Sequence, residues 1–221
     1  MLLEKERKEV MEYGRRMIKE GLTKGTGGNI SVVNREKNLM AITPSGIDYL
    51  EIIPEDIVVI DVKTGKIIEG ERVPSSEADM HRIFYKYRDD INAMVHTHSK
   101  YAAGYSCINQ KLPAIHYLLE VAGTDVPCAE YATYGTVRLA KNAFKAMEGT
   151  KAVLLSNHGM LAGGANLSEA YNIAENVEFC FELYFIAKTV GDPKILSEKE
   201  MQNMIERFKD YGKKSEEHEE I

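Results

Sequence analysis

Three histidines and one glutamate are the residues whose types and spacing best fit chemistry. His96 and His98 lie two positions apart in a segment, residues 93–98, that is typical of a strand. Because strand side chains alternate between faces, both imidazoles should point the same way. His158 follows a second strand-like segment, and Glu77 begins a segment rich in helix-forming residues.

Three imidazoles and a carboxylate suit a divalent transition metal, with zinc as the first candidate. Three neutral ligands leave most of the metal's positive charge available to polarise a substrate oxygen. Two imidazoles buried on one sheet face would be costly without a metal or hydrogen-bond partners, which favours a metal site. From spacing alone, structural histidines remain an open alternative, and nothing ties Glu77 to the same site.

Two short loops and one helix start could bind an anion. Residues 25–29 include three glycines, whose backbone N–H groups can approach an anion closely because glycine has no Cβ. Residues 43–46 form a second small turn with hydroxyl groups. Ser75 and Ser76 precede a helix, where unpaired N–H groups and the helix dipole favour a negative ligand. A tight turn and a simple helix cap are the plainer interpretations, and the sequence does not show that the three segments meet.

The overall composition describes one globular domain. The chain has 221 residues and a net charge of -6, from 28 basic and 34 acidic residues, which argues against a nucleic-acid partner. We expect one domain over residues 1–212 and a charged tail over 213–221. Three cysteines without a CxxC pair indicate free thiols in a reducing compartment. No signal peptide or membrane span is recognisable, so we expect a cytoplasmic protein with no membrane partner.

The elements that must position these residues alternate along the chain. Apolar spacing and capping residues predict helices over 3–20, from Glu77, from Ser99, and over 135–147, 168–190 and 197–210. Short apolar runs predict strands over 30–33, 39–43, 57–61, 67–68, 93–98 and 152–156. A connector without a predicted element covers 109–134. The alternation predicts an α/β layered domain, and the tight turns predict much antiparallel pairing in its sheet.

Taken together, these segments resemble the class II, metal-dependent aldolases of the L-fuculose-phosphate aldolase type. The matching stretches follow the family's order and spacing over nearly the whole chain; they are residues 25–31, 42–46, 74–77, 96–98, 112–117, 127–136, 157–159 and 208–212. The chain departs from the usual pattern at three positions, none of which affects the metal ligands: Ser45, Tyr134 and Asn157.

The resemblance implies an α/β fold with a central, mainly antiparallel sheet flanked by helices. It implies a homotetramer with active sites at subunit interfaces and one Zn²⁺ per subunit, held by His96, His98, His158 and Glu77. The residues implied to bind substrate phosphate are Gly28, Asn29, Ser45, Gly46, Ser75 and Ser76. Glu77 would also act as the catalytic base, and the implied catalytic tyrosines are Tyr117, acting across the subunit boundary, and Tyr211.

The reaction implied is reversible aldol cleavage of L-fuculose 1-phosphate, or a similar short ketose 1-phosphate, to dihydroxyacetone phosphate and L-lactaldehyde. Two alternatives use the same scaffold: a ribulose-phosphate 4-epimerase and a thio-pentulose-phosphate dehydratase. The epimerases typically carry aspartate where this chain has Glu77, which favours cleavage. A non-catalytic module like the adducin head would have an eroded histidine triad, whereas all three histidines are present here.

Overall fold

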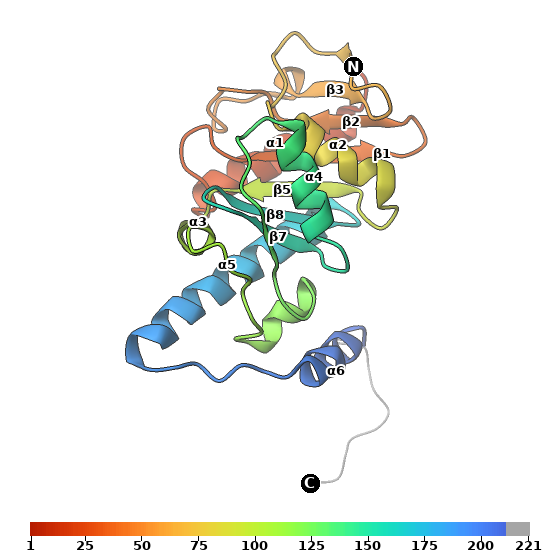
Figure 1. The fold of residues 1–221 in the computed structure, drawn as a ribbon. Coiled ribbons are helices and arrows are strands. Elements are labelled where there is room, and N and C mark those ends of the chain that lie inside the picture. The colour runs from red at the N-terminus through yellow and green to blue at the C-terminus, as the bar shows by residue number, and fades with distance from the viewer. Residues whose placement is uncertain (211–221) are drawn as a thin grey trace.

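An eight-stranded sheet runs through the centre of the domain (Figure 1), and the computed structural model describes residues 1–210. The strand order is β4-β3-β2-β1-β5-β8-β7-β6. Every pairing is antiparallel except the parallel pair β6–β7. The strands are β1 Asn29–Asn34, β2 Leu39–Ile42, β3 Val58–Asp61, β4 Ile67–Glu69, β5 Ala93–Thr97, β6 Cys128–Ala129, β7 Ala152–Leu155 and β8 Gly159–Gly164.

Helices cover both faces of the sheet, which confirms the expected α/β architecture. The helices are α1 Glu4–Lys19, α2 Ala78–Tyr87, α3 Lys100–Ser106, α4 Val137–Ala146, α5 Leu167–Val190 and α6 Glu198–Phe208, with 3-10 turns η1 Pro54–Asp56 and η2 Tyr117–Val121. The core on one face includes residues of α1, α3 and α5, and the core on the other includes residues of α2 and α4. The long helix α5 extends beyond the sheet, and α6 lies far from the N-terminus (Figure 1).

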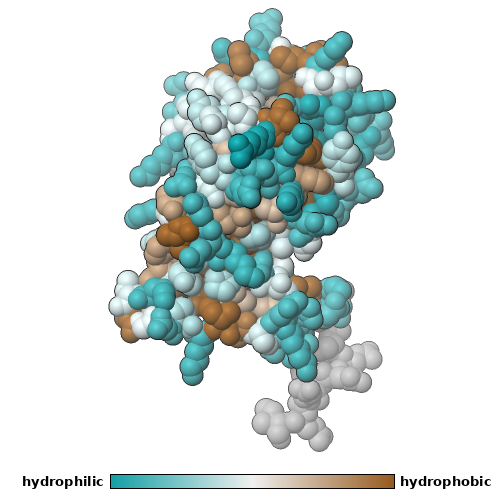
Figure 2. All heavy atoms as spheres, in the orientation of Figure 1, coloured by the Kyte–Doolittle hydropathy of each residue, from teal (hydrophilic) through white to brown (hydrophobic). Residues whose placement is uncertain are grey.

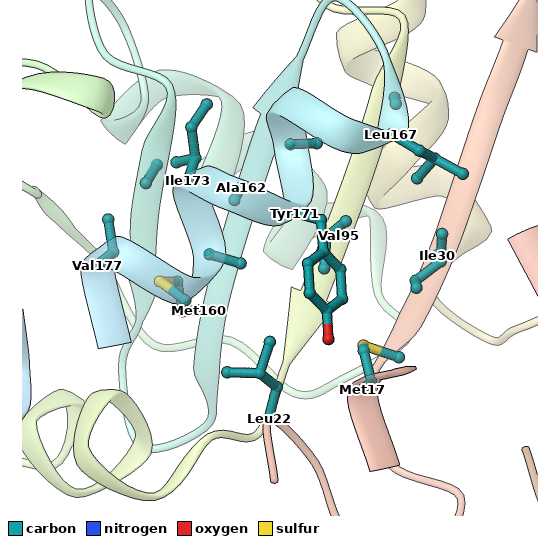
Figure 3. Close-up of a cluster of buried hydrophobic side chains, with 14 of the residues drawn as sticks. Met17, Leu22, Ile30, Val95, Met160, Ala162, Leu167, Tyr171, Ile173 and Val177 are labelled. Carbon is teal, nitrogen blue, oxygen red and sulfur yellow. The ribbon is translucent and has the colours of Figure 1, made fainter. Parts of the chain in front are cut away.

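The alternation of side chains along each strand builds these two cores. In β5, Val95 belongs to the core under α1, α3 and α5, whereas Met94 belongs to the core under α2 and α4. Figure 3 shows Val177 of α5 and Met17 of α1 among the side chains that pack with residues of the central strands. Even-numbered residues of β5 therefore face α2, and this places His96 on the α2 side of the sheet.

Strand β8 is the main element that sequence reasoning missed. Three of its six residues are glycine, a composition that disfavours strands. Its glycines are needed for close packing, because a Cβ on Gly164 would lie 2.6 Å from the backbone nitrogen of Ala170 in α5. β8 pairs with β5 in register, with His96 opposite Leu161. The connector at 109–134 also contains two short elements, η2 and β6, that were not predicted.

The start of α2 also differs from expectation. Its N-cap is Glu77, whose side chain makes no capping hydrogen bond, and Ser75 Oγ instead accepts a hydrogen bond from the Glu77 backbone N–H at 3.3 Å. Helix α1 ends as predicted, with Gly21 in the left-handed conformation just beyond it. Within residues 1–210, no helix is long and apolar enough to cross a bilayer.

Candidate metal centre

Three imidazole rings, from the end of β5 and from the turn between β7 and β8, lie close together. The ring centroids of His96, His98 and His158 lie 4.8 to 4.9 Å apart pairwise. One nitrogen from each ring lies within 4.8 Å of the other two. His96 is in β5, His98 immediately follows it, and His158 is in the turn between β7 and β8. The antiparallel pairing of β5 with β8 therefore brings together candidate ligands, His98 and His158, that are 60 residues apart in the chain.

Glu77 completes the group from the start of α2. Its Oε2 lies 3.2 Å from His96 Nε2, and its Oε1 lies 3.6 Å from His158 Nε2. Asn29 donates a hydrogen bond from Nδ2 to Glu77 Oε2 at 2.8 Å. Asn29 is paired with His96 in the β1–β5 register, so the sheet itself sets the amide beside the carboxylate. The structure thus supplies the link between Glu77 and the histidines that spacing could not.

A backbone carbonyl fixes the orientation of His96. Its Nδ1 lies 2.8 Å from the carbonyl oxygen of Met160 in β8. A carbonyl can only accept, so Nδ1 carries the proton and donates it. The neutral ring then presents the Nε2 lone pair to His98, His158 and Glu77, which is the arrangement that metal-binding histidines use.

The charges of these groups are strongly coupled. Burial alone would raise the pKa of Glu77, but the neighbouring His96 and His158 and the Asn29 amide lower it well below its usual range. Burial lowers the pKa of His96, but the Glu77 carboxylate outweighs it and raises that pKa. Burial, helped by the charge of His96, lowers the pKa of His98 to about 3 and that of His158 to about 4. Burial therefore keeps His98 and His158 neutral at pH 7.

The donor set fits a divalent metal ion. Glu77 Oε1 is buried and has no hydrogen-bond partner, although a carboxylate oxygen in such a place normally has one. The orphaned oxygen faces the same centre as three histidine nitrogens, and neutral imidazoles are the form that binds metal. Three nitrogens and one or two carboxylate oxygens match the ligands that zinc takes in catalytic sites.

Glycines allow the ligand strand to pack closely. A Cβ on Gly28 would lie 2.5 Å from the carbonyl oxygen of His96, and one on Gly27 would lie 2.7 Å from His98 Nδ1. A Cβ on Gly159 would lie 2.2 Å from the carbonyl oxygen of Thr97. Gly28 also has a φ of 71°, which favours glycine. The glycine-rich loop therefore has a packing role beside the histidines, in addition to any role in anion binding.

The ligands lie at a cavity of about 390 Å³. His98, His158 and Glu77 line it, and so do the residues expected to bind phosphate: Gly28, Asn29, Ser45, Gly46, Ser75 and Ser76. No lysine or arginine among residues 1–210 lines this cavity. An anion here would meet backbone N–H groups, hydroxyls, an amide and the positive end of α2.

Backbone hydrogen bonds bring the loops to this cavity. Ser45 donates its N–H to the carbonyl of Val73 at 2.9 Å, and Ser75 donates its N–H to the carbonyl of Thr43 at 3.1 Å. The Tyr49 hydroxyl donates to the carbonyl of Gly28 at 2.8 Å. The three segments that the sequence suggested separately, residues 25–29, 43–46 and 75–76, therefore line the same cavity.

Tyr117, one of the two tyrosines expected to be catalytic, does not line this cavity. Tyr117 begins η2, has 43% of its surface exposed, and stacks on His116 with ring centroids 4.5 Å apart. It is not among the residues lining the cavity within one chain. His116 caps η2, since its Nδ1 accepts a hydrogen bond from Leu118 N–H at 3.3 Å. Tyr211 and the tail at 213–221 lie outside the described residues.

Sequence reasoning gave no role to two tyrosines that the structure places at the cavity. Tyr131 and Tyr134 line it and are largely exposed, and Asn157 lines it with a left-handed φ of 54°. All three lie in stretches that matched the family pattern. Their types alone gave no signal, because exposed tyrosines and turn asparagines are common.

Comparison with known proteins agrees with this geometry. Residues 8–185 match the model of the class II aldolase and adducin N-terminal domain. A 5-deoxy-D-ribulose 1-phosphate aldolase from Bacillus thuringiensis serovar kurstaki is 53% identical over 212 residues, covering 96% of this chain and 99% of the relative. An L-fuculose phosphate aldolase from Escherichia coli strain K12 is 40% identical over 212 residues, covering 95% of this chain and 97% of the relative.

A solved structure supports the same assignment. An L-fuculose 1-phosphate aldolase superposes with a TM-score of 0.91 and 56% sequence identity, covering 93% of this chain and 96% of that one. The chain belongs to the class II aldolase and adducin N-terminal domain family.

Proposed function

We propose that this protein is a metal-dependent aldolase that reversibly cleaves a short ketose 1-phosphate to dihydroxyacetone phosphate and an aldehyde. The observation that carries the proposal is the meeting of His96, His98, His158 and Glu77 at a cavity lined with neutral anion-binding groups. His96, His98 and His158 would hold Zn²⁺, with Glu77 as a fourth ligand. The bound metal supplies Lewis-acid polarisation of the substrate oxygens.

The other residues around the cavity are proposed to bind the phosphate and to transfer the proton at C3. Gly28, Asn29, Ser45, Gly46, Ser75 and Ser76 hold the phosphate, and this fixes the three-carbon unit relative to the histidines. In the cleavage direction, the C4 hydroxyl loses its proton, the C3–C4 bond breaks, and its electron pair remains on the three-carbon fragment. Glu77 returns a proton to C3, and in the synthetic direction it removes that proton as general base.

Tyr117 is proposed to exchange the proton on the aldehyde oxygen from a neighbouring subunit, and Tyr211 to close the site. Tyr117 is exposed and outside the cavity of its own chain, which is consistent with a role in a homotetramer. Four exposed apolar side chains on α5 offer surface for subunit contacts: Phe179, Phe185, Ile186 and Val190. Figure 2 shows separate hydrophobic patches over the region of the molecule where α5 lies.

Two substrates follow from the comparisons. L-Fuculose 1-phosphate would give L-lactaldehyde, whereas 5-deoxy-D-ribulose 1-phosphate has one carbon fewer and would give acetaldehyde. The relative that acts on 5-deoxy-D-ribulose 1-phosphate is 53% identical, and the L-fuculose phosphate aldolase is 40% identical. The solved structure that is 56% identical is also named an L-fuculose 1-phosphate aldolase, so the identities leave both ketose phosphates as candidate substrates. Three unpaired cysteines, Cys107, Cys128 and Cys180, support a reducing compartment such as the cytoplasm.

An assay that measures dihydroxyacetone phosphate tests this proposal. The purified protein is offered both ketose phosphates, and in the reverse direction dihydroxyacetone phosphate with acetaldehyde or L-lactaldehyde. We expect triose phosphate from at least one ketose and a phosphorylated ketose in the reverse reaction. An epimerase would return an isomer and a dehydratase would release water, in each case without triose phosphate, and either result would overturn the cleavage proposal.

A further inference from the structure

The short helix α3 links the two outer histidines of the metal site. It begins two residues after His98, and its last residue, Ser106, contacts the turn that carries His158. The carbonyl of Ser106 accepts a hydrogen bond from Asn157 N–H at 3.1 Å, and Ser106 Oγ accepts one from His158 N–H at 3.2 Å. One end of α3 is therefore continuous with one ligand, and the other end is hydrogen-bonded to the backbone of a second.

The Ser106 hydroxyl both donates and accepts a hydrogen bond at this end of α3. Its single proton is donated to the carbonyl of Ala103 at 2.8 Å, which leaves a lone pair for His158 N–H. Ser106 is completely buried, so water cannot easily replace the hydroxyl as an acceptor. The hydroxyl thus joins the last turn of α3 to the ligand turn.

The other end of α3 is held by Glu178 of α5. Its Oε2 accepts hydrogen bonds from Ser99 Oγ at 2.6 Å and from Ala102 N–H at 2.9 Å, and its Oε1 accepts one from Tyr101 N–H at 2.8 Å. A carboxylate at the start of a helix also interacts favourably with the helix dipole. Three donors on one carboxylate fix the backbone that directly follows His98.

Packing keeps α3 seated between these two ends. Ala102 is fully buried, and the ring of Tyr105 packs against Phe181 of α5 with centroids 5.0 Å apart. Figure 1 shows α3 next to α5, beside the sheet. The helix has little freedom to shift relative to α5 without breaking the hydrogen bonds of Glu178.

We infer that α3 sets the spacing of His98 and His158, and that Glu178 and Ser106 are positioning residues for the metal site. This inference rests on the proposed metal-dependent function. Neither residue is among those lining the cavity, so each acts through the backbone of a ligand. A role in overall stability alone would leave metal affinity and coordination geometry unchanged in folded variants.

The test compares three variants of the full chain with wild type. Glu178→Gln replaces one carboxylate oxygen at the start of α3 with an amide donor and removes the charge. Ser106→Ala removes one of the two acceptors of His158 N–H, leaving the carbonyl of Leu155 at 3.0 Å. Glu182→Gln is the matched control, because Glu182 lies one turn further along α5 beside Tyr101. Zn²⁺ affinity is measured by competition with a chelating dye, and coordination by the visible spectrum of the Co²⁺ form. Circular dichroism establishes that each variant is folded.

We expect Glu178→Gln and Ser106→Ala each to weaken Zn²⁺ binding about tenfold or more and to alter the Co²⁺ spectrum, as mutation of residues that orient ligands typically does. Glu182→Gln should match wild type. Wild-type affinity and spectrum in either folded test variant would overturn the inference, as would an equal loss in the control. If Glu178→Gln does not fold, the Zn²⁺ affinity and Co²⁺ spectrum of Ser106→Ala test the inference alone. A wild-type protein that binds no metal would instead overturn the proposed function.

Discussion

The surroundings of Glu77 suit both roles proposed for it, metal ligand and general base. Its Oε2 is held by Asn29 and lies against His96, whereas its Oε1 has no hydrogen-bond partner. Glu77→Gln keeps the size and the amide contact but cannot take a proton at neutral pH. We expect it to keep its fold and much of its metal while kcat falls about 10²- to 10⁴-fold, the range for loss of a general base. Steady-state kinetics and metal analysis measure both effects.

The exposed Glu51 provides the control for this change. Glu51→Gln should retain wild-type kcat and metal content. Wild-type turnover by Glu77→Gln would contradict the role of Glu77 as base, whereas complete loss of metal would make it mainly a ligand.

His81 is a buried residue to which the sequence assigned no role. It is fully buried, and its Nδ1 lies 2.7 Å from Ser31 Oγ. Burial, followed by the charge of His96, lowers the pKa of His81 from 6.5 to about 3. The unfolded chain therefore binds one more proton than the folded chain between these pH values, and the native state loses stability as the pH falls through this window.

His81→Gln should remove this contribution. Between about pH 6 and pH 4, the free energy of unfolding of the variant should fall less steeply than that of wild type, by up to about 1.4 kcal/mol per pH unit. Chemical denaturation at a series of pH values measures the slopes. Parallel curves for the two proteins would show that His81 titrates alike in both states.

At this scale, the sequence identified the residues with distinctive spacing and missed those defined by packing. His96 and His98 could be paired because strand periodicity places them on one face. The contact of His81 with Ser31 joins residues 50 apart, and no local pattern predicts it. Tyr131 and Tyr134 were missed as lining residues for the same reason.

Among the elements, strand β8 is the clearest case in which local sequence did not predict the secondary structure. Strand propensity argues against a segment rich in glycine, yet β8 pairs with β5 along its length. The helices were predicted well, because α5 begins and ends within one residue of the predicted range and α4 and α6 within two. Their apolar spacing is a local signal, whereas the need for glycine in β8 arises from the neighbouring strand and helix.

Gly159 offers a test of this close packing. An added Cβ would lie 2.2 Å from the carbonyl oxygen of Thr97, the residue between His96 and His98. Gly159→Ala should lower the free energy of unfolding by about 1–3 kcal/mol, as overpacking typically does. Gly191→Ala is the control, since no atom lies within 4 Å of its added Cβ and its φ of 169° is extended backbone. Urea denaturation of both variants measures the difference, and equal stability would contradict the close approach.

For the whole molecule, the position of Tyr117 predicts that active sites are shared between subunits. Tyr117→Phe and Glu77→Gln are each expected to be poorly active alone. If the two residues act from different chains, mixed oligomers will contain some sites with both residues intact. A mixture that has exchanged subunits should then be more active than the sum of its parts, measured by release of dihydroxyacetone phosphate. Activity equal to that sum would place both residues in one chain's site.

The domain-level prediction of an α/β fold was confirmed, while the spatial meeting of distant loops could only be seen in the structure. Residues 43–46 and 73–75 meet through two backbone hydrogen bonds that carry no sequence signature. Family resemblance supplied the link between these loops and phosphate, and it rests on motifs spread over nearly the whole chain.

The central claim is that one divalent metal, held by His96, His98 and His158, makes cleavage possible. The direct measurement is the rate of dihydroxyacetone phosphate release from metal-depleted protein during titration with Zn²⁺. We predict negligible activity after chelation and recovery that saturates at one ion per chain. Undiminished cleavage by the metal-depleted protein would contradict the account and would point to an imine formed on a lysine instead.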